Sequence, residues 1–293
     1  MDPELITTEV EGPEGPCRIA VTGWGDPGAA RTIVCVHGLT RNARDFDVLA
    51  RDLAQDARVL AVDVPGRGRS AWFADPKHYD VPVYAALMSR LLDKLGLRSV
   101  DWIGTSLGGL IGMRLAAPAE TPIARLVLND IGPTVPTEVL EMIRAYLGLE
   151  LSFATLDELE QHLRQIHAPF GPLSDADWRH LAIHSSRQRE DGRWVLSYDP
   201  AIRIPFAEQG EADFDEWPTY DAIRCPTLLI RGKDSLVLTD EILAQMRQRG
   251  PRPEVVAFEG IGHAPTLTTP DQVAAVRGWL LGERLSGTHH PAG

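Results

Sequence analysis

The sequence from residue 99 to residue 108 reads Ser99-Val100-Asp101-Trp102-Ile103-Gly104-Thr105-Ser106-Leu107-Gly108. Its first half is an apolar run typical of a buried strand, and small residues suited to a helix follow, from Leu107 to Ala117. A G-x-S-x-G pentapeptide between a strand and a helix predicts a strained turn that raises the serine hydroxyl above the edge of a sheet. Glycine is required at both ends of this pentapeptide because a side chain there would collide with the neighbouring strand and helix. Ser106 is therefore the residue on which a functional hypothesis can be built.

Strands and helices alternate on both sides of this turn. Continuous Val, Ile and Leu runs separated by helical patterns predict a parallel sheet covered by helices on both faces. In such a sheet the functional site lies at the carboxyl ends of the strands. An antiparallel strand pair is expected at residues 4–23. Further strands are expected near residues 32–36, 58–64, 99–103, 123–129, 225–231 and 254–258, and helices near 44–55, 81–96, 107–117, 239–249 and 270–281.

Residues 135–217 interrupt the alternation. Three amphipathic helices are expected there, at 137–151, 155–168 and 174–189, and the second opens with the capping box Thr155-Leu156-Asp157-Glu158. A helical excursion at the functional edge of a sheet suits a cap that roofs a pocket and excludes water. The predicted organisation is a core of residues 1–134 and 218–285, a helical cap of residues 135–217, and a disordered tail of residues 286–293.

Three further segments resemble the α/β-hydrolase superfamily, in the expected order. A strand ends in His37-Gly38-Leu39, which is similar to the turn that shapes the oxyanion hole in that family. Residues 63–70 resemble its D-x-P-G-x-G-x-S loop, and Gly260-Ile261-Gly262-His263 matches its G-x-G-H segment. The resemblance implies an α/β-hydrolase fold, with Ser106 as nucleophile and His263 as catalytic base. It also implies that the oxyanion hole is formed by the backbone N–H groups of Leu39 and Leu107.

The acid that completes the triad has two candidates. In most members of the family it stands about three residues beyond a glycine that ends the seventh strand, where this chain has Ser235, and Asp234 is one residue short. The segment Asp130-Ile131-Gly132-Pro133 instead resembles the D-I-A-P or D-I-G-P signature of a bacterial serine esterase branch, in which the acid follows the sixth strand. A side chain at a rigid strand end is aimed more reliably than one in a loop of the wrong spacing. Asp130 is therefore favoured, and Asp234 stays as the alternative.

The chemistry of these residue types predicts a serine hydrolase. A serine hydroxyl needs a base to take its proton, imidazole titrates near neutral pH, and an acceptor must hold the imidazole in the right tautomer. We expect cleavage of a carboxylic ester or related acyl substrate through an acyl-enzyme. A lactonase, a C–C bond hydrolase or an acyltransferase would use the same triad. A non-catalytic receptor for a small ligand is the alternative from a different class.

The sequence offers weaker indications about binding. Arg41 follows the oxyanion turn and could reach a polar acyl group, and Trp178 and Tyr198 are candidate pocket walls. His180 and His184 stand four residues apart on a helix, but no third metal ligand is evident, so no metal site is predicted. No G-x-G-x-x-G fingerprint opens the first βα unit, so no dinucleotide or other cofactor is expected.

Net charge limits the choice of partners. The 293 residues include 29 basic and 41 acidic ones, which gives a net charge of −12. This charge argues against nucleic acid or an anionic membrane surface as partner. The N-terminal residues lack the basic and apolar regions of a signal peptide, so a cytoplasmic location is expected. A small-molecule ester is the expected partner, and the sequence leaves the oligomeric state open.

Overall fold

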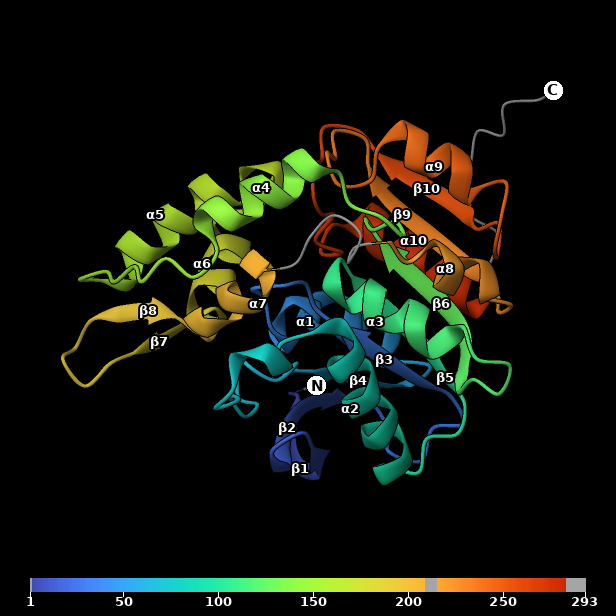
Figure 1. Cartoon of the computed structure of the whole chain (residues 1–293), viewed down its shortest axis with the longest axis horizontal. Coiled ribbons are helices and arrows are strands. Elements are labelled where there is room, and N and C mark those ends of the chain that lie inside the picture. The colour runs from blue at the N-terminus through green and yellow to red at the C-terminus, as the bar shows by residue number, and fades with distance from the viewer. Residues whose placement is uncertain (1, 209–214, 283–293) are drawn as a thin grey trace.

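The computed structural model describes residues 2–208 and 215–282, and its centre is an eight-stranded sheet (Figure 1). The strands lie in the order β1-β2-β4-β3-β5-β6-β9-β10. β1 pairs with β2, and β2 with β4, in antiparallel fashion, and every later pair in that order is parallel. The strands span Glu4–Gly12 (β1), Gly15–Trp24 (β2), Thr32–Val36 (β3), Arg58–Val62 (β4), Val100–Thr105 (β5), Ile123–Asn129 (β6), Thr227–Gly232 (β9) and Glu254–Phe258 (β10).

Helices cover both faces of this sheet. On one face α2 packs against α3, and the core there includes Trp102. On the other face α1 contacts α10, and the core there includes Trp24. The prediction of a mostly parallel sheet between two helical layers is therefore confirmed. The helices of this part are Ala43–Phe46 (η1), Asp47–Leu53 (α1), Pro76–His78 (η2), Val81–Lys94 (α2), Leu107–Ala116 (α3), Trp217–Ala222 (α8), Asp240–Met246 (α9) and Pro270–Leu281 (α10).

Strand β4 shows why the central strands read as continuous apolar runs. All five of its residues are buried. Leu60 and Val62 point into the core beneath α2 and α3, whereas Val59 and Ala61 point into the core beneath α1 and α10. Burial of each large aliphatic side chain contributes about 1.5–3 kcal/mol. A strand whose side chains enter a core on each side has no face suited to water, so it lies in the middle of the sheet between two helical layers.

The chain leaves the sheet after β6 and forms a group of short elements before it returns at α8. These elements lie to the upper left of the sheet in Figure 1. Leu159, Leu163 and Ala182 form a small core of their own between α5 and α6. The elements are Thr137–Tyr146 (α4), Leu156–Ile166 (α5), Ala168–Phe170 (η3), Asp175–His184 (α6), Ser186–Gln188 (β7), Trp194–Leu196 (β8), Pro200–Ile202 (η4) and Arg203–Glu208 (α7).

This region departs from the sequence prediction at several helix ends. The helix expected over 137–151 ends at Tyr146, because Gly148 has a φ of 73° that no helix accommodates. The helix expected over 174–189 ends at His184, and the antiparallel pair β7 and β8 follows it. Strands of three residues carry no readable alternation, so the sequence does not predict them. The short helices α7 and α8 were likewise not expected.

Two helices of this region, α5 and α6, start with different caps. Ser174 opens α6 with a reciprocal capping box, in which its hydroxyl accepts from the Asp177 N–H and the Asp177 carboxylate accepts from the Ser174 N–H. Thr155 opens α5 and accepts from the Glu158 N–H at 3.2 Å, but the Glu158 carboxylate accepts from the N–H of Ala154. One hydrogen bond of the predicted capping box is therefore present, whereas the Glu158 carboxylate binds the N–H of Ala154, one residue before Thr155.

Among the described residues, no helix is both long enough and apolar enough to cross a membrane. The predicted tail, residues 286–293, lies outside the described residues. The division into a core of residues 1–134 and 218–285 and a cap of residues 135–217 stays a prediction.

Candidate active site

Ser106 lies in a sharp turn between β5 and α3. Its φ of 51° is in a region that residues with a side chain rarely adopt. A Cβ atom on Gly104 would lie 2.2 Å from the carbonyl oxygen of Gly108, and one on Gly108 would lie 2.0 Å from the carbonyl oxygen of Val36. Backbone atoms cannot move away at so many points at once, so both positions admit only glycine. The turn predicted from the sequence is the turn in the structure.

Ser106, His263 and Asp130 form a line of hydrogen bonds. The Ser106 hydroxyl lies 3.0 Å from Nε2 of His263, and Nδ1 of His263 lies 2.9 Å from Oδ2 of Asp130. An ionised carboxylate only accepts hydrogen bonds, so Nδ1–H donates to Asp130 and Nε2 is left to accept from the serine. This tautomer is the one that general-base activation of a serine needs.

Asp130 is held from two sides at the end of β6. It is fully buried, and its φ of 57° turns the chain away from the sheet. Its Oδ1 accepts from the N–H of Gly232, the last residue of the adjacent strand β9, at 3.1 Å. Its neighbour Asn129 donates to the Pro265 carbonyl at 2.8 Å and so ties the loop that carries His263 to the same strand end. Asn129 was not predicted as a site residue, because its only signal in the sequence is its place beside Asp130.

Asp234 is not brought to His263. Its backbone N–H donates to the Ile261 carbonyl, and its carboxylate forms no hydrogen bond or ion pair with any residue that the structure describes. The neighbouring Ser235, which stands where most of the family has its acid, accepts from the N–H groups of Val237 and Leu238. The loop after β9 therefore closes on itself, and of the two candidate acids only Asp130 contacts the imidazole.

The two backbone N–H groups of the expected oxyanion hole flank the Ser106 turn. Leu107 is the first residue of α3, so its N–H has no acceptor within the helix. Leu39 follows His37 and Gly38 in a turn braced by the buried imidazole of His37, whose Nδ1–H donates to the Gly38 carbonyl and whose Nε2 accepts from the Val64 N–H. Burial lowers the pKa of His37 to about 3, so the ring is neutral and acts as a structural brace.

Arg67 supports the same turn from behind. Its Nε donates to the Leu39 carbonyl at 2.7 Å, and its Nη1 donates to the Pro65 carbonyl and the Tyr84 hydroxyl. The side chain is fully buried, yet it forms no ion pair with any described residue, and its Nη2 has no hydrogen-bond partner. An arginine in a loop is usually a solvated surface charge. The structure instead places an uncompensated cation behind the candidate oxyanion hole.

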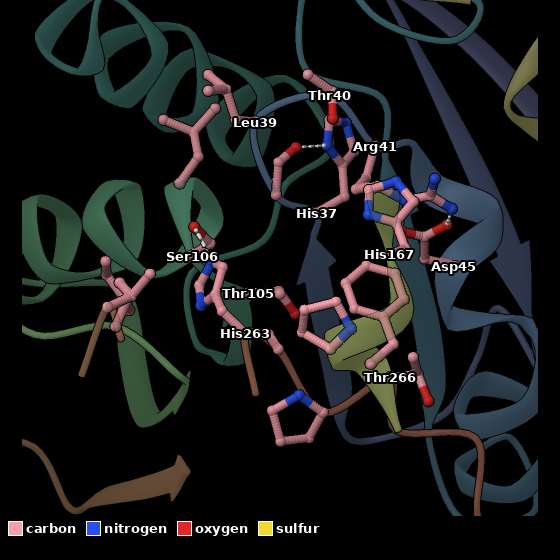
Figure 2. A pocket seen from close by; sticks show the side chains of 18 of the residues that line it. His37, Leu39, Thr40, Arg41, Asp45, Thr105, Ser106, His167, His263 and Thr266 are labelled. Carbon is pink, nitrogen blue, oxygen red and sulfur yellow. Dashed lines mark hydrogen bonds and ion pairs between the residues drawn. The ribbon is translucent and has the colours of Figure 1, made fainter. Parts of the chain in front are cut away.

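A cavity of about 670 Å³ opens above Ser106 and has two chemically different sides (Figure 2). Apolar residues of α3, of α4 and of the chain between these helices line the cavity and are called the apolar arm, whereas polar residues of the segment after the oxyanion turn, together with Thr105, His167 and Thr266, are called the polar arm. The apolar arm comprises Leu107, Leu110, Ile131, Val135, Val139, Leu140, Ile143 and Tyr146. The polar arm comprises Thr40, Arg41, Asp45, Thr105, His167 and Thr266.

Of the three residues expected to bind substrate, only Arg41 lines this cavity. Trp178 and Tyr198 do not line it, which corrects the expectation that they form pocket walls. Trp178 is buried under the guanidinium of Arg164, whose Cζ lies 5.6 Å from the indole. Tyr198 belongs to the main core and pairs through its backbone with Arg67. Both aromatic side chains serve packing between elements.

Asp47 supplies a possible third partner for the His180 and His184 pair. Ligand-type atoms of the three residues lie within 4.8 Å of one another. Both oxygens of Asp47 are already bound by the Arg44 guanidinium, and Nε2 of His180 donates to the Arg44 carbonyl at 3.0 Å. These contacts explain the cluster as a set of hydrogen bonds and ion pairs that connects α6 with η1 and the start of α1.

A serine in a tight strand-to-helix turn, hydrogen-bonded to an imidazole that a buried carboxylate orients, defines the class of serine hydrolases. The model of the Alpha/beta hydrolase family matches residues 33–276 of this chain. The chain therefore belongs to the alpha/beta hydrolase family, and it carries the fold predicted from the sequence.

Named relatives agree with this class. The chain is 42% identical over 290 residues to the 3-hydroxybutyrate-oligomer hydrolase of Cupriavidus necator, covering 96% of this chain and 98% of that protein. It is 31% identical over 235 residues to an esterase of Mycobacterium tuberculosis, covering 79% and 75%. The crystal structure of an alpha/beta hydrolase from Novosphingobium aromaticivorans superposes with a TM-score of 0.85 at 37% identity, covering 97% and 99%. The chain is thus a hydrolase of the carboxylesterase type.

Proposed function

We propose that this chain hydrolyses short oligoesters of hydroxy acids, with Ser106 as nucleophile, His263 as general base and acid, and Asp130 as the residue that orients His263. The observation that carries the proposal is the line of hydrogen bonds from the Ser106 hydroxyl through His263 to Asp130, at 3.0 and 2.9 Å. The substrate class is suggested by the hydrolase of Cupriavidus necator, which is similar over almost the whole chain.

The reaction follows from the positions of these groups. His263 takes the proton of Ser106 through Nε2 while the hydroxyl oxygen attacks the ester carbonyl. The resulting imidazolium is stabilised by Asp130, and the negative oxygen is met by the N–H groups of Leu39 and Leu107, each worth about 3 kcal/mol of barrier. The proton then passes to the leaving alcohol as its C–O bond breaks. Water, activated by His263, finally releases the acid from Ser106.

Residues 135–217 complete the proposed site as its cap. Helix α4 contributes much of the apolar arm, and His167 beyond α5 contributes to the polar arm. A roof from these elements would exclude bulk water from the acyl-enzyme and strengthen its polar contacts. The acidic charge of the chain fits our further expectation of no nucleic-acid partner, and a cytoplasmic location also stays an expectation.

The proposal is tested by measuring ester turnover and acylation of the protein in the wild type and in a variant that lacks the Ser106 hydroxyl. We expect the wild-type protein to hydrolyse p-nitrophenyl butyrate and a linear dimer of 3-hydroxybutyrate, with an initial burst and an acylated Ser106 in the intact mass. Ser106→Ala should lose several orders of magnitude in turnover while its urea unfolding curve stays unchanged. Normal turnover in this variant, or release from a lactone but from no linear ester, would reject the proposal.

A further inference from the structure

The polar arm of the cavity contains a buried cation that hydrolysis of a simple ester does not use. Arg41 is only 7% exposed. Its Nε and Nη2 donate to the two oxygens of Asp45 at 2.9 and 2.7 Å. Its Nη1 has no hydrogen-bond partner in the described part of the chain, although the residue lines the cavity. A guanidinium held on one edge and open on the other is prepared to bind a second acceptor.

Arg41 also begins next to the nucleophile. A Cβ atom on Gly38 would lie 3.7 Å from Cγ of Arg41 and 3.7 Å from Cβ of Ser106. Figure 2 shows Arg41, Asp45 and His167 together on one side of Ser106. In an ester of a 3-hydroxy acid, only two carbons separate the ester oxygen from the carboxylate, so a side chain that binds this carboxylate must start close to the nucleophile, as Arg41 does.

We propose that the polar arm is a subsite for a free carboxylate on the alcohol half of the ester, with Arg41 as its anchor. The inference rests on the proposed function and names the end of the oligomer that is bound. The chain would then remove hydroxy acid units from the carboxyl end, because the terminal acid sits in the polar arm while its ester bond lies at Ser106. The acyl half enters the apolar arm.

The surroundings of Arg41 favour an anion with directional acceptors over a neutral group. The ion pair with Asp45 fixes the guanidinium plane before binding, so little side-chain ordering remains to oppose the contact. Burial, together with the charge of Arg41, lowers the pKa of the neighbouring His167 well below its usual value, and this neutral ring adds a polar contact without a second charge. Thr40 and Thr266 add hydroxyls to the same side.

Two substrates that differ only in charge test the subsite. 3-Butyryloxybutanoate and 3-butyryloxybutanamide each contain one ester and have nearly the same shape. We expect wild-type kcat/KM to be about 30-fold higher for the acid than for the amide, mainly through KM, which is the discrimination typical of one charge-assisted contact. Free 3-hydroxybutyrate should inhibit p-nitrophenyl butyrate hydrolysis competitively and more strongly than 3-hydroxybutanamide. Equal kcat/KM values would overturn the subsite without touching the triad.

Variants then assign the preference to Arg41. Arg41→Met should lower the acid-to-amide ratio of kcat/KM at least tenfold, and Arg41→Lys should restore part of it, since the lysine keeps the charge and loses the fork. Arg51→Met is the matched control, because Arg51 lines the same cavity but is half exposed and contacts Asp47 at 3.4 Å. An equal fall of the ratio in Arg51→Met would show that overall charge at the cavity sets the preference and would refute a direct contact.

Folding and the proposed function are controlled separately. If Arg41→Met is recovered unfolded, Arg41→Lys keeps a cation beside Asp45 and carries the test, and the subsite predicts an acid-to-amide ratio below the wild-type value because the lysine loses the fork. A wild-type ratio in folded Arg41→Lys would contradict the fork-shaped contact. If the wild-type protein does not hydrolyse p-nitrophenyl butyrate, the proposed function is wrong. If it hydrolyses the acid and the amide at equal rates, only the proposed subsite is wrong.

Discussion

Replacement of Asp130 by Asn gives the sharpest test of the candidate triad. Oδ2 of Asp130 lies 2.9 Å from Nδ1 of His263, and Oδ1 accepts from the N–H of Gly232 at 3.1 Å. An asparagine cannot serve both contacts as an acceptor. If its oxygen still accepts from Gly232, its NH₂ group faces Nδ1 and donates to it. His263 then carries its proton on Nε2 and can no longer accept the proton of Ser106.

The size of the loss follows from this exchange of tautomers. In serine proteases the corresponding Asp-to-Asn change lowers kcat about 10⁴-fold. That factor equals about 5.5 kcal/mol of barrier at about 1.36 kcal/mol for each power of ten. We expect Asp130→Asn to lower kcat by this order and to change KM by less than about threefold, because Asp130 is fully buried and is not among the residues that line the cavity.

The assay compares two matched variants with p-nitrophenyl butyrate. Asp234→Asn is the control, because Asp234 lies at the cavity in the loop after β9 but forms no hydrogen bond or ion pair with His263, and we expect its kcat to stay within about threefold of wild type. Urea unfolding of both variants checks that the fold is kept. The assignment of Asp130 fails if folded Asp130→Asn retains more than a tenth of wild-type kcat, or if Asp234→Asn shows the larger loss.

Other consequences of the structure can be tested in the same preparation. Gly108→Ala places a Cβ atom 2.0 Å from the Val36 carbonyl oxygen, and we expect at least about 3 kcal/mol less unfolding free energy in urea, so wild-type stability would contradict the geometry. Arg67→Met removes the buried charge and the donor to the Leu39 carbonyl, and we expect kcat to fall by about 10–100-fold with little change in KM. Tyr84→Phe is the control, because it loses one contact of Arg67 but keeps the charge, and its kcat should fall far less. The pKa of His37 falls from 6.5 to about 3 on folding, so between these two pH values the unfolded chain binds a proton that the folded chain does not. The contribution of His37 to the free energy of unfolding is therefore complete above pH 6.5. It falls by up to about 1.4 kcal/mol for each pH unit as the pH drops towards 3. Urea midpoints at pH 7, 6 and 5 should show the decline, with a smaller slope in His37→Asn, and equal slopes would count against it.

The central sheet could be predicted from the sequence because its strands have no polar face. The last four residues of β4, from Val59 to Val62, divide between two cores, so this part of the strand reads as an uninterrupted apolar run. The turn at Ser106 was equally readable, since a side chain on either flanking glycine would collide with backbone atoms of α3 or at the end of β3. The buried strand and the serine turn are each encoded in one short stretch of sequence, so the sequence alone is enough to predict them.

The remaining features depend on how distant segments meet. Asp130 and Asp234 both follow strands that end at the same edge of the sheet, so the sequence could narrow the choice of acid but could not decide it. The burial of Arg67 depends on its contact with Leu39, 28 residues away along the chain. Tyr198 was expected at the pocket for its residue type, but it packs against the loop of Arg67 and away from the cavity.

The position of Asp130 on β6 has a consequence for how this protein can diversify. The segment from Lys233 to Val237, which would carry the acid in most of the family, here contributes Asp234, Leu236 and Val237 to the cavity and nothing to the orientation of His263. Leu236 is 63% exposed, so its replacement disturbs little packing. Laboratory evolution can therefore reshape substrate range through this loop while the chemical machinery stays anchored in the neighbouring strand.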